Sequence, residues 1–178
     1  DNELLDEFAD LWIWKIILEK HIDLDDIINP ERLTQIAFWI NKATEKVRQL
    51  AWRFITEIYP SHKIFELINS TNDIEIFQWD WDYLSSSNKI SLDLNTLHRY
   101  KERINWSLLS SNSFLNGFFR NDREIYGTRK QWKNHVLSYL SEFADLWDFK
   151  ELSKLDNITR SETIVYYFRQ KWDWDILS

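Results

Sequence analysis

Hydrophobic residues recur along this chain at the spacing of one face of an α-helix. Residues 3–19 show this spacing, which predicts an amphipathic helix. A longer stretch follows Asn29 and Pro30, a residue pair typical of a helix start, and continues to Tyr59, where Pro60 stops it. We therefore expect one long helix from Pro30 to Tyr59. Its apolar stripe comprises Leu33, Ile36, Ile40, Ala43, Val47, Leu50, Phe54 and Ile58. A third amphipathic stretch comprises Trp132, Val136, Leu140, Phe143 and Trp147.

A second pattern is superimposed on this one, because a short segment of the chain is repeated. Residues 79–85 read Trp-Asp-Trp-Asp-Tyr-Leu-Ser, and residues 172–178 read Trp-Asp-Trp-Asp-Ile-Leu-Ser. Weaker copies occupy 105–110 and 147–153. Internal repetition indicates stacked copies of one small unit, because a single hairpin cannot bury its apolar face alone.

The copies have a regular spacing. Trp81 and Trp106 lie 25 residues apart, as do Phe149 and Trp174, and 43 residues separate Trp106 from Phe149. Together these spacings define a superunit of about 68 residues. The letters of 7–12 also recur exactly at 142–147, which places a first, eroded superunit at Trp12.

Each unit is predicted to be a helical hairpin. The recurring segment forms a short first helix with local polar caps, and a second helix starts near Ser91 or Thr159. The fold class expected is all-α, an irregular α-solenoid of helical-hairpin repeats with units of about 25 and 43 residues. Residues 1–76 form a helical region with a degenerate repeat, and 77–178 hold the clear repeats with an insertion at 111–133. The predicted structural core of the repeats comprises Trp81, Leu84, Trp106, Leu109, Phe149, Leu152, Trp174 and Leu177.

Composition supports a helical body. The 178 residues include eleven Trp but only two Gly and two Pro, so the turns that sheets require are scarce. The chain has no Cys, which is typical of a reducing compartment, and it shows neither a membrane-length apolar run nor a signal peptide. We therefore expect a cytoplasmic protein without membrane contact. Because no Met occurs, we also expect the sequence to be an excerpt of a longer chain.

The repeated residues carry a resemblance to a known family. The order Trp-Asp-Trp-x-x-Leu-Ser, followed by Ile90-Ser91 or Ile158-Thr159 and by Tyr100-Lys101, resembles the tryptophan-rich WDWxxLS repeats of large bacterial and giant-virus proteins. The resemblance covers about 77–110 and 146–178. It implies a helical repeat array used for interaction, and it brings no catalytic residues.

The candidates for catalysis are weak. Asp80 with Asp82, and Asp173 with Asp175, are paired carboxylates that suit a hard cation. Within a helix, however, residues two apart point in different directions, so one member is expected to cap the helix or face water. The four His residues lack metal-ligand spacing, and Ser85, Ser110, Ser153 and Ser178 are interpreted as helix-end caps. We expect a protein that is not an enzyme, with no catalytic, cofactor-binding or metal site.

The predicted insertion at 111–133 supports nucleic-acid binding as an alternative function. Basic and aromatic residues alternate there as they do in surfaces that bind single-stranded nucleic acid. The formal net charge of the chain is −7, which opposes phosphate binding. The candidate contacts are Arg120, Arg123, Tyr126, Arg129, Lys130, Trp132 and Lys133.

The sequence thus favours a non-enzymatic module for protein–protein interaction or scaffolding, with binding assigned to exposed side chains that vary between copies. Two ways of covering Trp172 and Trp174 stay open, either by residues outside this sequence or by another chain, and a repeat end left uncovered exposes apolar surface that invites association. The alternative is a nucleic-acid-contacting, sensor or targeting arm of a larger bacterial antiviral or toxin system.

Overall fold

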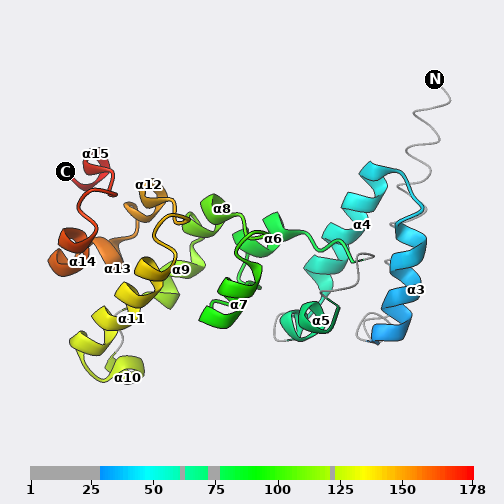
Figure 1. Ribbon diagram of the computed structural model, residues 1–178, viewed down its shortest axis with the longest axis horizontal. Helices are drawn as coiled ribbons and strands as arrows, with labels where there is room; N and C mark the ends of the chain where they lie inside the picture. The colour runs from blue at the N-terminus through cyan, green and yellow to red at the C-terminus, as the bar shows by residue number, and fades with distance from the viewer. Residues whose placement is uncertain (1–28, 61–62, 72–76, 121–122) are drawn as a thin grey trace. The chain divides into compact units, whose positions relative to one another are not determined.

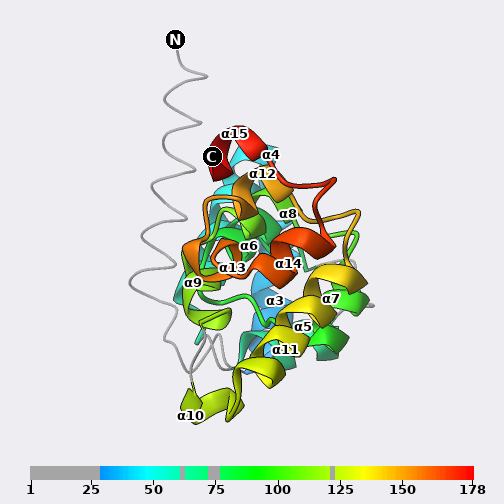
Figure 2. The same ribbon diagram turned by 90° about the vertical axis from the view of Figure 1, so that its left-hand side faces the viewer.

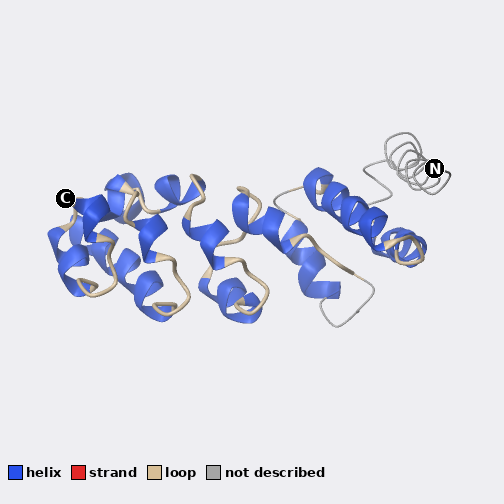
Figure 3. Cartoon of the chain, turned by 90° about the horizontal axis from the view of Figure 1, so that it is seen from above, coloured by secondary structure: helices blue, strands red, loops and turns tan. Residues whose placement is uncertain are grey.

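The computed structural model describes residues 29–60, 63–71, 77–120 and 123–178. In these ranges the backbone forms helices and loops and contains no strand (Figure 1, Figure 3). The all-α prediction is confirmed for this part of the chain. Both the helix predicted at 3–19 and the eroded repeat at Trp12 fall outside these ranges. The chain divides into two compact units, Asp1–Leu84 and Ser85–Ser178, which we call unit 1 and unit 2.

Unit 1 contains α3 (Pro30–Ile40), α4 (Glu45–Ile58) and α5 (Ile64–Thr71). The predicted start of α3 is confirmed, since the Asn29 side chain accepts hydrogen bonds from the backbone N–H groups of Glu31 and Arg32 and Pro30 stands in the first turn. The predicted single helix from Pro30 to Tyr59 is wrong, because the helix stops at Ile40 and α4 packs back against α3.

The physical reason for this break lies at residues 41–44. The backbone N–H groups of Asn41, Lys42 and Ala43 bond to α3 carbonyls in a closing turn. The Asn41 side chain also accepts a hydrogen bond from Nε1 of Trp52 on α4 at 3.2 Å, which fixes the turn. Beyond the turn the buried face changes register. Val47, Ala51 and Ile55 are buried in α4, whereas Leu50 of the predicted stripe is 46% exposed.

Helix α6 (Trp81–Ser86) spans the boundary between the units, and unit 2 continues with α7 (Leu94–Tyr100) and α8 (Trp106–Ser110). The start of α7 is set by Asp93, whose side chain accepts the N–H of Thr96. The predicted second helix therefore begins three residues after Ser91. The helix predicted near Thr159 has the same offset, because Thr159 is the last residue of one helix and the next helix begins three residues later at Glu162, after a Ser161 N-cap.

The segment predicted as an insertion contains α9 (Phe114–Phe118), α10 (Arg123–Tyr126) and the first turns of α11 (Arg129–Glu142). Gly127 links α10 to α11 with φ of 66°, in the left-handed region that favours glycine. Thr128 then caps α11 in a capping box with Gln131. The turn chemistry thus defines where the long helix of unit 2 begins.

The remaining helices of unit 2 are short: α12 (Phe149–Leu152), α13 (Asp156–Thr159), α14 (Glu162–Tyr167) and α15 (Trp174–Leu177). Within unit 2, α8, α12 and α15 follow one another along one edge, and α7, α11 and α14 lie along another (Figure 1, Figure 2). The helices of the recurring segment are therefore neighbours in space. Among the described residues, no helix combines the length and hydropathy that a membrane span requires.

Candidate functional site

One hydrogen bond recurs wherever a copy of the repeated segment meets the next. The hydroxyl at the end of one copy accepts the backbone N–H of the residue that precedes the aromatic residue of the following copy. In unit 2 the N–H groups of Asn105, Asp148 and Asp173 donate to Ser85 (3.0 Å), Ser110 (2.9 Å) and Ser153 (3.1 Å). The three hydroxyl-bearing residues are buried. We call this contact, together with the aromatic residue beside it, the joint.

The buried hydroxyl of Ser153 also donates a hydrogen bond. Its Oγ donates to the carbonyl of Phe149, four residues earlier in its own helix, at 2.7 Å. One small side chain therefore completes the end of its helix and holds the next copy. The sequence predicted the capping role only. A buried N–H left without a partner costs about 1–3 kcal/mol, so the joint requires a hydroxyl at this position.

The residue whose N–H donates at the joint is also the N-cap of its helix. Asp148 accepts N–H groups from Lys150 and Glu151, and Asp173 accepts those of Asp175 and Ile176. In each Asp pair named from the sequence, the first member accepts backbone N–H groups at a helix start, Asp80 at α6 and Asp173 at α15. In the part of the chain that the structure describes, no group of three or more His, Asp or Glu side chains has a metal-binding arrangement.

Aromatic residues fill the other half of the joint. The ring of Trp106 lies 5.0 Å from that of Phe143 and 4.9 Å from that of Trp147, centroid to centroid. Phe149 is placed in the same way against Phe168 (5.3 Å) and Trp172 (5.0 Å). In both cases the two partner rings lie four residues apart in the sequence, just ahead of the next N-cap residue. They cover the aromatic residue of the preceding copy by edge and tilted contacts.

The predicted core residues divide between buried and exposed positions. Trp106, Leu109, Phe149 and Leu152 are buried, as is Leu84. Trp81 and Leu177 are half-buried. The assignment of Trp174 to the core is wrong, because its side chain is 53% exposed. No described aromatic pair covers it as Phe143 and Trp147 cover Trp106.

The sequence reading missed a further copy in unit 1. Residues 52–56 read Trp-Arg-Phe-Ile-Thr, and Trp52, Ile55 and Thr56 are fully or almost fully buried. The Thr56 hydroxyl accepts the N–H of Asp80 at 3.2 Å and donates to the carbonyl of Trp52 at 2.7 Å. A search allowing Ile for Leu and Thr for Ser would have found this copy. It was hidden because it lies inside the 14-residue helix α4 rather than at a helix start.

The residues just before the buried aromatic of each second helix are exposed. Tyr100, Phe143 and Phe168 are buried, and the two residues ahead of each are exposed. These exposed pairs are His98-Arg99, Ser141-Glu142 and Tyr166-Tyr167. Their chemistry differs in every copy. We call the three pairs the variable row.

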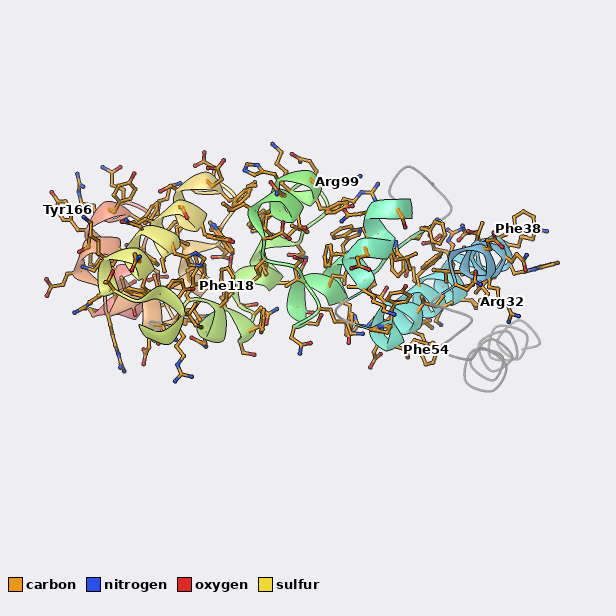
Figure 4. All side chains as sticks on the ribbon, turned by 90° about the horizontal axis from the view of Figure 1, so that it is seen from below. Arg32, Phe38, Phe54, Arg99, Phe118 and Tyr166 are labelled. Atoms are coloured by element: carbon orange, nitrogen blue, oxygen red, sulfur yellow. The ribbon has the colours of Figure 1, made fainter. Side chains whose placement is uncertain are left out.

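The first two pairs of the variable row are in contact. His98 Nε2 lies 3.0 Å from Glu142 Oε1, which joins the first pair to the second. Tyr166 and Tyr167 are 70% and 61% exposed, and the Arg169 guanidinium lies 5.0 Å from the Tyr166 ring centre. Figure 4 shows Arg99 and Tyr166 pointing away from the helices that carry them. At Tyr166 and Tyr167 the row exposes two adjacent aromatic side chains.

The residues proposed for nucleic-acid contact are not presented as one surface. Trp132 is 2% exposed and donates from Nε1 to the carbonyl of Phe119 at 2.9 Å, so the prediction that it stacks on bases is wrong. Tyr126 is half-buried and donates its hydroxyl to the carbonyl of Phe118. Arg120, Arg129 and Lys130 are exposed, whereas Lys133 is half-buried and donates to Thr163. Arg123 is the first residue of α10, and its side chain lies outside the described part.

An aromatic cluster surrounds His135 on α11. Its ring lies 4.7 Å from that of Tyr139, 5.0 Å from Tyr126 and 5.3 Å from Phe118. Burial lowers the pKa of His135 and raises that of Tyr139. Both side chains are thereby held in their neutral forms, so the cluster is an apolar satellite of the core.

Unit 1 has an open cleft of about 480 Å³. Its lining includes Trp52, which holds the turn with Asn41, and Asp80, which caps α6 and pairs with Arg53 at 3.2 Å. These side chains already stabilise the fold. The full lining is Gln49, Trp52, Gln78, Trp79, Asp80, Trp81 and Asp82.

No protein-family model, no curated protein and no solved structure matches this chain. The joints and the variable row are therefore the features of the chain that bear on its function.

Proposed function

We propose that the chain is a non-enzymatic helical-repeat module, an irregular solenoid of helical hairpins, that binds another protein through the variable row. The observation that carries this proposal is the contrast between neighbouring positions of each second helix. Tyr100, Phe143 and Phe168 are buried aromatics, whereas the pairs just ahead of them are exposed and differ in chemistry. In repeat arrays, constant positions hold the stack and variable exposed positions bind.

The exposed side chains suit a protein partner. Tyr and Arg are enriched at the energetic centres of protein interfaces, and Tyr loses little conformational entropy when it is bound. Tyr166 and Tyr167 present both of their rings to solvent, with Arg169 beside Tyr166. An isolated exposed aromatic is ordinary on a protein surface. Two adjacent ones at a position that varies between copies favour recognition.

Capture from a lysate of the source cells tests this proposal, with the chain carrying both Tyr166→Ser and Tyr167→Ser. The matched control is Phe114→Ser, because Phe114 is an exposed aromatic of unit 2 outside the variable row. We expect the double variant to lose at least about tenfold of a specific retained protein, since interface aromatics contribute about 2 kcal/mol or more. The control should retain it.

Two outcomes would contradict the proposal. Retention that is equal in the double variant and the wild type would move binding away from the variable row. Retention that vanishes after nuclease treatment would favour the nucleic-acid alternative. Circular dichroism and thermal melting of each variant show whether the substitutions leave the fold intact.

A further inference from the structure

The joint of unit 1 differs from those of unit 2 because it borders an open cleft. Helix α4 begins at Glu45, so it extends beyond the buried Trp52 toward its N-terminus, whereas α8 and α12 begin at their own aromatic residues. Gln49 on this extension and the segment 78–82 line the cleft of about 480 Å³. All of the lining residues belong to unit 1. The cleft has the size of pockets that hold small molecules.

The indole N–H of Trp79, which lines this cleft, lacks the bond that its counterparts in later copies make. Nε1 of Trp147 donates to the carbonyl of Tyr139 at 3.1 Å. Nε1 of Trp172 donates to the carbonyl of Val165 at 3.0 Å. Nε1 of Trp79 is buried and has no hydrogen-bond partner in the part of the chain that the structure describes. Since buried polar groups are almost always hydrogen-bonded, this N–H is a donor that a bound molecule can satisfy.

The other charged groups of the lining are two carboxylates, and none of the lining residues is basic. Asp80 accepts the N–H of Tyr83 through Oδ1 at 2.8 Å and pairs with Arg53 through Oδ2 at 3.2 Å. These contacts orient its carboxylate and leave it further acceptor capacity. Asp82 and Gln78 are exposed. The cleft therefore combines an unpaired donor with acceptors of negative charge.

This combination selects the chemistry of an occupant. An anion would accept from the Trp79 N–H but be repelled by Asp80 and Asp82, and an ammonium ion would meet the carboxylates but cannot accept. Neighbouring hydroxyl groups accept and donate from one side of a molecule, so a neutral polyhydroxylated ring meets both demands. The apolar face of such a ring also suits the half-buried indole of Trp81.

We propose that the cleft of unit 1 binds a neutral saccharide. One hydroxyl oxygen accepts from Nε1 of Trp79, neighbouring hydroxyls donate to Asp80 and Asp82, and the sugar ring packs against Trp81. The indoles of Trp147 and of its counterpart in the last copy already have acceptors, so binding is assigned to unit 1 alone. The site is separate from the variable row and gives the module a second class of ligand.

Titration of the ¹⁵N-labelled full chain with glucose, galactose, mannose and N-acetylglucosamine tests this proposal through the indole N–H resonances. Trp79→Phe and Trp81→Phe assign the two resonances of interest. We expect at least one sugar to shift both of them with an affinity on the order of millimolar, since an open cleft makes few hydrogen bonds. If none of the four sugars shifts either resonance, the proposal is overturned.

Substitutions then test the assigned contacts. Asp82→Asn and Trp79→Phe should each weaken sugar binding by about fivefold, because each removes or weakens one hydrogen bond. The matched control is Asp175→Asn, since Asp175 holds the position of Asp82 in the copy at 172–178 and lies outside the cleft. It should leave the affinity unchanged. Wild-type affinity in both cleft variants, with their folds intact by circular dichroism, would contradict the site.

Three further probes distinguish other occupants. Glucuronate has the ring of glucose with an added carboxylate and should bind more weakly, whereas equal or tighter binding would show that the two Asp side chains do not face the ligand. Lysine methyl ester and N-acetylglycine amide represent a cation and a peptide, and a preference for either over the sugars would overturn the proposal. Tyr166→Ser with Tyr167→Ser should leave sugar binding unchanged, so this site and the variable row can fail independently.

Discussion

Two spans of unit 2 link successive copies of the recurring segment, and they differ almost twofold in length. From Ser110 to Asp148 the chain takes 38 residues and forms α9, α10 and α11, whereas from Ser153 to Asp173 it takes 20 and forms α13 and α14. Both spans end in the same joint, with N–H to hydroxyl distances of 2.9 and 3.1 Å.

The difference shows that the joint, and not the length of the connection, fixes where the next copy lies. The extra residues of the long span form their own apolar cluster around His135, with Phe118, Tyr126 and Tyr139. Loop length costs little free energy when the ends are held. An insertion that supplies its own core can therefore be accommodated between fixed joints.

The largest expected effect on stability comes from removing the aromatic residue of the joints that end the two spans, Trp106 or Phe149. Trp106→Ala and Phe149→Ala should each lower the free energy of unfolding by about 3–5 kcal/mol, because each ring is buried against two others. Urea denaturation measures this. Similar losses would support equivalent joints, whereas a loss below about 1 kcal/mol at one of them would show that the two spans are closed differently. Trp174→Ala is the matched control, and its exposed side chain should cost much less.

The hydroxyls provide a finer comparison. Ser110→Ala and Ser153→Ala should each cost about 1–3 kcal/mol, because the N–H of Asp148 or Asp173 loses its acceptor. Hydrogen exchange should accelerate at that amide in particular. Ser138→Ala is the control, because the exposed Ser138 hydroxyl donates only within its own helix, and it should stay within about 0.5 kcal/mol of the wild type. Equal exchange rates in wild type and variant at Asp148 would refute the joint.

The sequence predicted the helical class and the short helices of the recurring segment, where an Asp or Asn precedes the first helical residue of α8, α12 and α15 as a favoured N-cap. It did not predict the break after Ile40. Periodicity continued through residues 41–44, and the decisive contact is between Asn41 and Trp52, eleven residues apart. The copy at Trp52 was missed because Ile55 and Thr56 replace Leu and Ser.

The candidate surfaces were harder to predict than the fold. Trp106 and Trp174 stand in equivalent positions of the repeat, and only tertiary packing distinguishes the buried one from the exposed one. The variable row was foreseen in principle as side chains that differ between copies. Its residues could be named only once the buried positions of Tyr100, Phe143 and Phe168 were known.

A smaller effect is expected at the caps. Asp148→Ala should cost about 1 kcal/mol through the loss of the bonds from Lys150 and Glu151, while the backbone N–H can still donate to Ser110. Asp173→Ala should cost about as much at the shorter span. Asp148→Asn keeps an acceptor and should recover most of the loss, as Asn105 fills the same role in α8. A failure of Asn to rescue would mean that the charge, rather than the hydrogen bond, stabilises α12.

The smallest expected effect is a pH dependence of stability that arises in the long span, which contains His135, and not in the short one. Burial lowers the pKa of His135 below its ordinary value of 6.5, so the unfolded chain binds a proton before the folded one does. At pH above 6.5 the residue is neutral in both states and has no effect. As the pH falls below 6.5, stability is lost until the lowered folded pKa is reached.

His135→Gln should remove this part of the decrease in melting temperature between pH 7 and pH 5. Since His135 belongs only to the long span, the protection of α11 amides, measured relative to their intrinsic exchange rates at each pH, should decrease at pH 5 while that of α13 and α14 changes less. An equal decrease in both spans would show that the satellite cluster and the short span unfold as one cooperative unit.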